Sequence, residues 1–185
     1  TNRNYLKAGL FIAFLAGSTM TYAQEAIKYQ LPPQSIVNLV DAPQIPMEEF
    51  SPDGRYMLVL EVPGFQTIIQ ASQPVLGVAG LRINPISNTT VAESLGTFKG
   101  LKIRDLSNGS EFSIQGLPQD LQIADVKWSS KPGVFAFLNK SLEDTELWVA
   151  DLNSKSAKKL LSKVNDTYGN TFQWNGDGTA LLAQQ

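Results

Sequence analysis

The 185-residue sequence contains neither cysteine nor histidine. Without cysteine, the chain has no disulfide, no thiolate nucleophile and no cysteine-based metal site. Without histidine, it lacks the usual general base of a Ser-His-Asp triad and the commonest zinc ligand. A Gly-x-Ser-x-Gly nucleophile motif is also missing. These residues alone are therefore not expected to form a hydrolase active site, and neither a metal nor a cofactor is expected.

The sequence also lacks an excess of positive charge. Fifteen lysines and arginines stand against 17 acidic residues, for a net charge of −2. A nucleic-acid partner, which requires a basic face, is therefore not expected. The 43% hydrophobic and 17% charged composition is that of an ordinary folded protein.

The first 23 residues have the three parts of a secretory signal peptide. Arg3 and Lys7 supply positive charge, residues 8–17 form an apolar run, and residues 18–23 are small or polar, with cleavage expected after Ala23. The alternative is a buried helix or a membrane anchor, but about ten apolar residues are too few to span a bilayer. The mature protein is thus expected to be periplasmic or secreted, with no membrane attachment after cleavage.

Residues 24–47 form a proline-rich lead-in arm, in which the spacing of the prolines predicts one short helix over residues 35–40. Beyond this arm, a unit of strand and turn appears twice at a spacing of 46 residues. Residues 101–105 and 147–151 are alternating strands that end in Asp, and the same offset relates Trp128 to Trp174. A repeat of about this length is typical of a β-propeller blade.

The pattern predicts an all-β fold for residues 48–185. We expect a partial β-propeller of four-stranded antiparallel sheets, with about two blades and half of a third, and an insertion at residues 61–100. In the middle unit the strands are predicted at 123–129, 133–139, 145–151 and 157–161, where the last segment has a helical turn as its alternative. Because the sequence ends within the third unit, a fragment of a longer ring is expected.

Several side chains are candidates for function. Asp53, Asp105, Asp151 and Asp177 have the chemistry of acid catalysts or cation ligands, but their positions at turns favour hydrogen bonds to local backbone. The tryptophans Trp128, Trp148 and Trp174 have stacking surfaces, but their repeated positions favour packing between sheets. Arg82 and Asn84, in the insertion, are the candidate substrate-binding residues, because an arginine binds a carboxylate with two hydrogen bonds. The favoured alternative is that Arg82 pairs with an acid and supports the loop.

Four segments occur in a characteristic order: Tyr-Gln-Leu-Pro-Pro at 29–33, Val-Asp-Ala-Pro at 40–43, Phe-Ser-Pro-Asp-Gly at 50–54 and Ala-Gly-Leu-Arg-Ile-Asn-Pro at 79–85. In these segments the chain resembles the amino-terminal propeller of the prolyl oligopeptidase family of serine peptidases, in particular its glutamyl-endopeptidase branch. The resemblance implies a two-domain enzyme whose propeller gates the access of peptides to a carboxy-terminal α/β-hydrolase domain. None of that domain's catalytic residues lies in this chain, so the chain alone is expected to be inactive.

The expected partners are therefore that hydrolase domain and peptide substrates. An alternative function is a fragment of a non-enzymatic periplasmic propeller of the TolB type, which binds proteins. The Ser-Pro-Asp-Gly turn at 51–54 occurs in many propellers and does not separate the two hypotheses.

Overall fold

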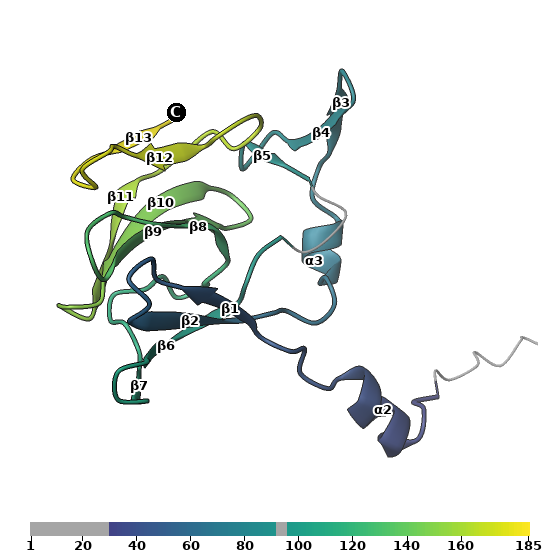
Figure 1. Cartoon of the computed structure of the whole chain (residues 1–185). Helices are drawn as coiled ribbons and strands as arrows, with labels where there is room; N and C mark the ends of the chain where they lie inside the picture. Colours follow the sequence, from purple (N-terminus) through teal and green to yellow (C-terminus); the bar gives the residue numbers. More distant parts are fainter. Residues whose placement is uncertain (1–29, 92–95) are drawn as a thin grey trace, which may run out of the picture. The chain divides into compact units, whose positions relative to one another are not determined.

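The computed structural model describes residues 30–91 and 96–185, so the predicted signal peptide lies outside the described part (Figure 1). The described residues belong to two units, which divide in sequence between Val40 and Asp41. In the first unit the short helix α2 (Gln34–Val40) forms where the prolines predict it. Among the described residues, no helix is both long and apolar enough to cross a membrane.

The second unit, residues 41–185, is built from four antiparallel sheets, and its all-β class is confirmed. Sheet A has the order β1-β2-β6-β7, sheet B β3-β4-β5, sheet C β11-β10-β9-β8 and sheet D β12-β13. The strands are β1 (Met47–Phe50), β2 (Tyr56–Glu61), β3 (Leu76–Val78), β4 (Leu81–Asn84), β5 (Thr89–Thr90), β6 (Gly100–Asp105), β7 (Glu111–Phe112), β8 (Ile123–Trp128), β9 (Val134–Lys140), β10 (Thr145–Asp151), β11 (Ser156–Leu161), β12 (Phe172–Trp174) and β13 (Leu181–Ala183).

Sheet C agrees with the strands predicted from the repeat. Its four strands follow one another in chain order, each antiparallel to the next. The fourth segment is strand β11 and not a helical turn. It pairs with β10 along its length, and its two lysines, Lys158 and Lys159, are exposed on the outer edge of the sheet. Charged side chains at such an edge discourage pairing with another chain.

Both faces of sheet C are covered, which explains why strand β9 is almost continuously apolar. Phe135 and Phe137 point into one apolar cluster, which they share with residues of sheet A such as Leu58 and Ile103. Ala136 and Leu138 alternate with them and enter a second cluster, together with sheet D residues including Phe172. Because successive side chains of a strand point to opposite faces, sheet C is the middle layer between sheets A and D.

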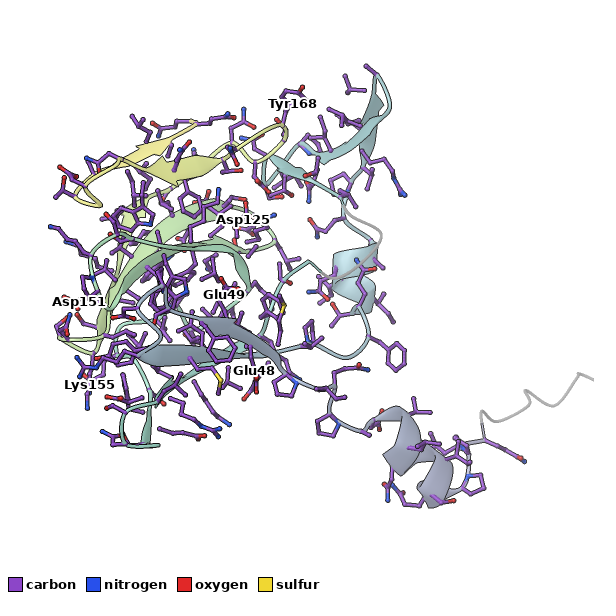
Figure 2. All side chains as sticks on the ribbon, viewed as in Figure 1. Glu48, Glu49, Asp125, Asp151, Lys155 and Tyr168 are labelled. Carbon is purple, nitrogen blue, oxygen red and sulfur yellow. The ribbon has the colours of Figure 1, made fainter. Side chains whose placement is uncertain are left out.

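Hydrogen bonds join sheet C to the sheets on either side. Beside sheet A, Gln115 donates its backbone N–H to the carbonyl of Lys155 and accepts a hydrogen bond from the N–H of Ala157. The Lys155 ammonium lies 4.8 Å from the centre of the Phe112 ring. Figure 2 shows Lys155 with Asp151 at the turn between β10 and β11. These contacts anchor the outer strand of sheet C to the segment that follows β7.

Beside sheet D, the first strand of sheet C contacts the first strand of the next sheet. Lys127 Nζ donates a 2.8 Å hydrogen bond to the carbonyl of Phe172. Trp174 Nε1 in turn donates a 2.9 Å hydrogen bond to the carbonyl of Lys127. The two tryptophans spaced by 46 residues therefore lie on strands that are neighbours in space, β8 and β12.

The segment predicted as an insertion lies between β2 and β6 of sheet A. It contains helix α3 (Ile68–Ala71) and all of sheet B. A capping box starts the helix, because Thr67 and Gln70 exchange hydrogen bonds with each other's backbone N–H groups. Glu61 and Gly100 at the ends of the insertion are directly paired across sheet A. The insertion therefore leaves the sheet and returns to it at one place.

Candidate functional site

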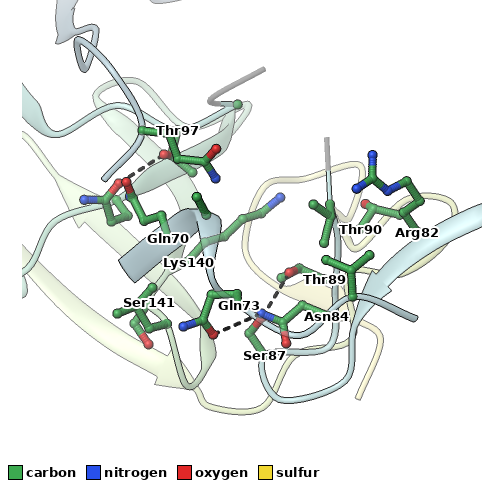
Figure 3. Close-up of a pocket in the computed structure, with 17 residues that line it drawn as sticks. Gln70, Gln73, Arg82, Asn84, Ser87, Thr89, Thr90, Thr97, Lys140 and Ser141 are labelled. Carbon is green, nitrogen blue, oxygen red and sulfur yellow. Dashed lines mark hydrogen bonds between the residues drawn. The ribbon is translucent and has the colours of Figure 1, made fainter. Parts of the chain in front are cut away.

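An open cavity of about 450 Å³ lies between the insertion and the turn that follows β9 (Figure 3). Its wall is mostly made of amide and hydroxyl side chains, and the lining residues that the structure describes include two cations and no acid. The lining residues are Gln66, Gln70, Ala71, Gln73, Val75, Arg82, Asn84, Ser87, Thr89, Thr90, Val91, Gly96, Thr97, Gln122, Lys140, Ser141 and Leu142. Such a surface presents many hydrogen-bond donors and acceptors to a ligand, together with net positive charge.

Asn84, one of the two predicted substrate-binding residues, forms part of the cavity wall. Its side chain is buried, with 6% of its surface exposed. The Asn84 carboxamide oxygen accepts the backbone N–H of Ile86 at 2.9 Å, and its amide nitrogen lies 3.4 Å from Gln73 Oε1. These contacts hold the turn after β4 and connect it to the end of α3.

Arg82, the other predicted residue, is exposed on β4 and lines the same cavity as Asn84. The ion pairs in the described part of the chain involve other cations, and none includes Arg82. In the alternative interpretation, an acid neutralises Arg82 and supports the loop. No acid among residues 30–91 and 96–185 forms that ion pair. Among the described residues, no ion pair occupies the hydrogen-bond donors of the Arg82 guanidinium.

Lys140, the second cation of the cavity, is held by an acid. Its ammonium lies 2.5 Å from Asp166 Oδ2, and both side chains are largely buried, with 22% and 10% of their surfaces exposed. The other oxygen of Asp166 accepts the hydroxyl of Thr171. Lys140 is therefore a neutralised, fixed part of the wall, in contrast to Arg82.

Asp166 also attaches the insertion to the rest of the unit. Its backbone N–H donates to the carbonyl of Asn88 at 2.8 Å, and its own carbonyl accepts both the N–H and the hydroxyl of Thr90. Beside it, the buried hydroxyl of Thr145 donates to the carbonyl of Ser87 at 3.0 Å. The polar run at residues 87–90 thus serves as the anchor of sheet B.

The aspartates singled out from the sequence are turn residues, as their positions favoured. Asp105 accepts the N–H and the hydroxyl of Ser107, and Asp151 accepts the N–H of Asn153. The hydrogen bonds from Ser107, and the charge of Arg55 nearby, hold the pKa of Asp105 below its ordinary value of 3.8. Among the described residues, no group of three or more acids is placed to hold a metal ion.

The other two aspartates, Asp53 and Asp177, have the same role. Asp53 accepts the hydroxyl of Ser51, and Asp177 accepts the N–H and the hydroxyl of Thr179. These hydrogen bonds lower the pKa of each carboxyl. The Asn-Gly-Asp-Gly segment at 175–178 is the turn of the β12–β13 hairpin.

The three tryptophans pack within the protein and do not form a stacking surface. Trp148 is 9% exposed and stacks on Phe137 at a centroid distance of 6.4 Å. Trp128 lies 5.1 Å from the ring of Phe135, and Trp174 packs against the cluster between sheets C and D. The indole N–H of Trp128 is buried and has no hydrogen-bond partner in the part of the chain that the structure describes.

Most residues of the cavity are not among those predicted from the sequence. Gln70 lies in α3 and Gln73 just after it, and the Thr-x-x-Gln pattern of a capping box at 67–70 would have indicated this helix. Thr97, Gln122 and Lys140 come from three different segments. Thr97 Oγ1 donates to Gln122 Oε1 at 3.0 Å, an interaction that no local pattern predicts.

No protein-family model matches the chain. Two curated plant proteins are similar to it, and both are named "Probable glutamyl endopeptidase, chloroplastic". The protein from Oryza sativa subsp. japonica is 31% identical over 166 residues, which are 83% of this chain and 18% of the relative. The protein from Arabidopsis thaliana is 30% identical over 166 residues, which are 84% of this chain and 17% of the relative. The chain therefore spans less than a fifth of the length of these relatives and, over most of its own length, is similar to part of proteins named as peptidases.

Proposed function

We propose that residues 41–185 are part of a β-propeller, in which sheets A and C are blades and sheet D begins a third. Three features support this. Sheets A and C have four antiparallel strands each, sheet C packs sheet A on one face and sheet D on the other, and the spacing of Trp128 and Trp174 places them on neighbouring first strands. Radial stacking of such sheets is how a propeller buries blade faces that a single sheet leaves exposed.

We further propose that this propeller belongs to an exported serine peptidase, where it gates the access of peptides to a hydrolase domain outside this chain. The similarity to two proteins named as glutamyl endopeptidases, extending over 166 residues, carries this proposal. The absence of histidine from the sequence means that any Ser-His-Asp triad must have its histidine elsewhere.

Within this scheme the cavity contacts the peptide, with Arg82 as the residue that meets it. Asn84 shapes the wall through its contacts with Ile86 and Gln73. Export, to the periplasm or the medium, is proposed from the pattern of residues 1–23. Amino-terminal sequencing of the mature protein tests the export step, with Gln24 expected as the first residue and a mature protein that retains residues 1–23 as the contradicting result.

The complete reading frame provides a direct test of the peptidase. Beyond Gln185 we expect further blades and then a domain with Gly-x-Ser-x-Gly, followed by Asp and His. Further blades followed by a stop codon would instead support the non-enzymatic, TolB-like propeller.

The gating role is tested by trimming the insertion in the complete protein. Because Glu61 and Gly100 are directly paired, residues 62–96 can be replaced by a short glycine-rich loop that leaves sheet A intact and keeps the pairing of Phe98 with Ile123. Because the trim also removes Arg82, each enzyme is assayed on a long, unfolded protein and on a short chromogenic peptide, and the ratio of the two rates is compared. The ratio of long-substrate to short-substrate cleavage is expected to rise in the trimmed enzyme, and an unchanged ratio would contradict the gating role.

A further inference from the structure

The β3 edge of sheet B has no partner strand in the described part of the chain. Strand β3 pairs with β4 on one side only, and its three residues, Leu76–Val78, are all exposed. An edge of this kind presents unpaired N–H and C=O groups to which an extended polypeptide can add as a further strand. No charged residue lies on β3 to oppose such pairing.

The register of the β3–β4 hairpin pairs Arg82 with a glycine. Arg82 is directly opposite Gly77, and residues directly opposite in an antiparallel pair project from the same face of the sheet. Because Gly77 has no side chain, no side chain of β3 stands between Arg82 and a strand that adds to the β3 edge on this face. The neighbouring pairs, Leu76 with Ile83 and Val78 with Leu81, project from the other face.

We propose that an extended, acidic polypeptide adds to the β3 edge and that its carboxylate side chain reaches across Gly77 to Arg82. Strands lie about 4.8 Å apart, so the added residue stands about 10 Å from the Arg82 backbone. The long arginine side chain and a glutamate side chain together span that separation. The lining supports an acidic ligand, because it contains no acid and Arg82 is its one cation without an ion pair among the described residues.

This inference rests on the proposed function in one respect, because the peptidase role makes a polypeptide the expected ligand. The experiment measures binding without proteolysis, by fluorescence anisotropy with the 185-residue chain. The probe is a labelled eight-residue peptide of high β-propensity with one central glutamate. Its two matched controls are the same peptide with glutamine in place of glutamate, and the glutamate peptide with alternate backbone amides methylated. The glutamine peptide is expected to bind about tenfold more weakly, and the methylated peptide is expected to lose most binding.

Two variants locate the contact. R82Q should abolish the preference for glutamate over glutamine, whereas R104Q, which removes an exposed arginine of β6, should keep it. G77V should also abolish the preference, since its branched side chain stands between Arg82 and the added strand. A Cβ at Gly77 meets nothing within 4 Å, and the backbone there is not left-handed, so G77V is expected to fold.

Equal affinity for the glutamate and glutamine peptides would overturn the inference, as would full binding of the methylated peptide or loss of the preference in R104Q. The outcomes for the two proposals can be distinguished. If the 185-residue chain binds the glutamate peptide selectively but the complete gene product lacks a hydrolase domain, the peptidase proposal is wrong and the binding site stands. An active peptidase whose propeller shows no preference through Arg82 would overturn the binding site alone.

Discussion

Gly116 lies where sheets A and C meet, and its replacement by alanine should separate them. The backbone at Gly116 is left-handed, with φ +79°, and a Cβ built there would stand 2.7 Å from the carbonyl oxygen of Ala157. That oxygen belongs to the backbone, so no side-chain rotation relieves the contact. The adjacent hydrogen bonds of Gln115, to Lys155 and from Ala157, must therefore lengthen or break.

The expected cost of G116A follows from these contacts. A left-handed backbone costs an alanine about 1 kcal/mol, and each of the two hydrogen bonds contributes about 1 kcal/mol. The free energy of unfolding should fall by about 3 kcal/mol. Gly109 provides the matched control, because its φ is +73° but a Cβ there meets nothing within 4 Å. G109A should lose only about 1 kcal/mol.

Urea unfolding followed by tryptophan fluorescence measures both variants. Trp128 and Trp148 belong to or pack against the cluster between sheets A and C, so their emission reports its exposure to water. If G116A lost no more stability than G109A, the contact between Gly116 and Ala157 would be refuted, and with it the packing of sheet A on sheet C.

Two further substitutions test other contacts. W174F removes the hydrogen bond to the Lys127 carbonyl, whereas W128F removes an indole N–H that has no partner among the described residues. W174F should therefore lower the free energy of unfolding by about 1 kcal/mol more than W128F does. Equal losses in urea unfolding would contradict the contact between β8 and β12. Burial by itself raises the pKa of Glu146, but hydrogen bonds, first among them that of Lys159, outweigh it and hold the pKa below 4.5. The ionised carboxylate therefore stabilises the fold above that pH, and this contribution is lost as the pH falls. The difference in the free energy of unfolding between wild type and E146Q, the stability gap, should be up to about 1 kcal/mol at pH 7. It should shrink toward pH 3, and a gap independent of pH would exclude the ion pair as its source.

The features that local sequence predicts well are those in which one segment determines its own structure. Strands 123–129 and 145–151 alternate between two buried faces, and the structure has them as β8 and β10. Asp105 ends a strand and accepts hydrogen bonds from the residue two positions later, as an aspartate at a turn does. Composition and turn chemistry suffice for such elements.

The features that could not be predicted depend on contacts between distant segments. Asp166 binds Lys140 and the backbone of Asn88 and Thr90, which lie 26 to 78 residues earlier in the chain. The cavity depends on this attachment, because it sets the insertion against the turn after β9. Asp125 has a left-handed backbone, φ 48°, at a bulge in β8, where a glycine or asparagine would have signalled the irregularity.

The central proposal is that this chain is part of the propeller of a serine peptidase, and covalent labelling of the complete gene product tests it most directly. A fluorophosphonate reacts with the activated serine of such an enzyme, and mass spectrometry of the digested protein locates the label. We predict a single labelled serine beyond Gln185, within a Gly-x-Ser-x-Gly segment, and loss of labelling when the downstream histidine is replaced. A complete protein that takes up no label, or is labelled within residues 1–185, would contradict the account.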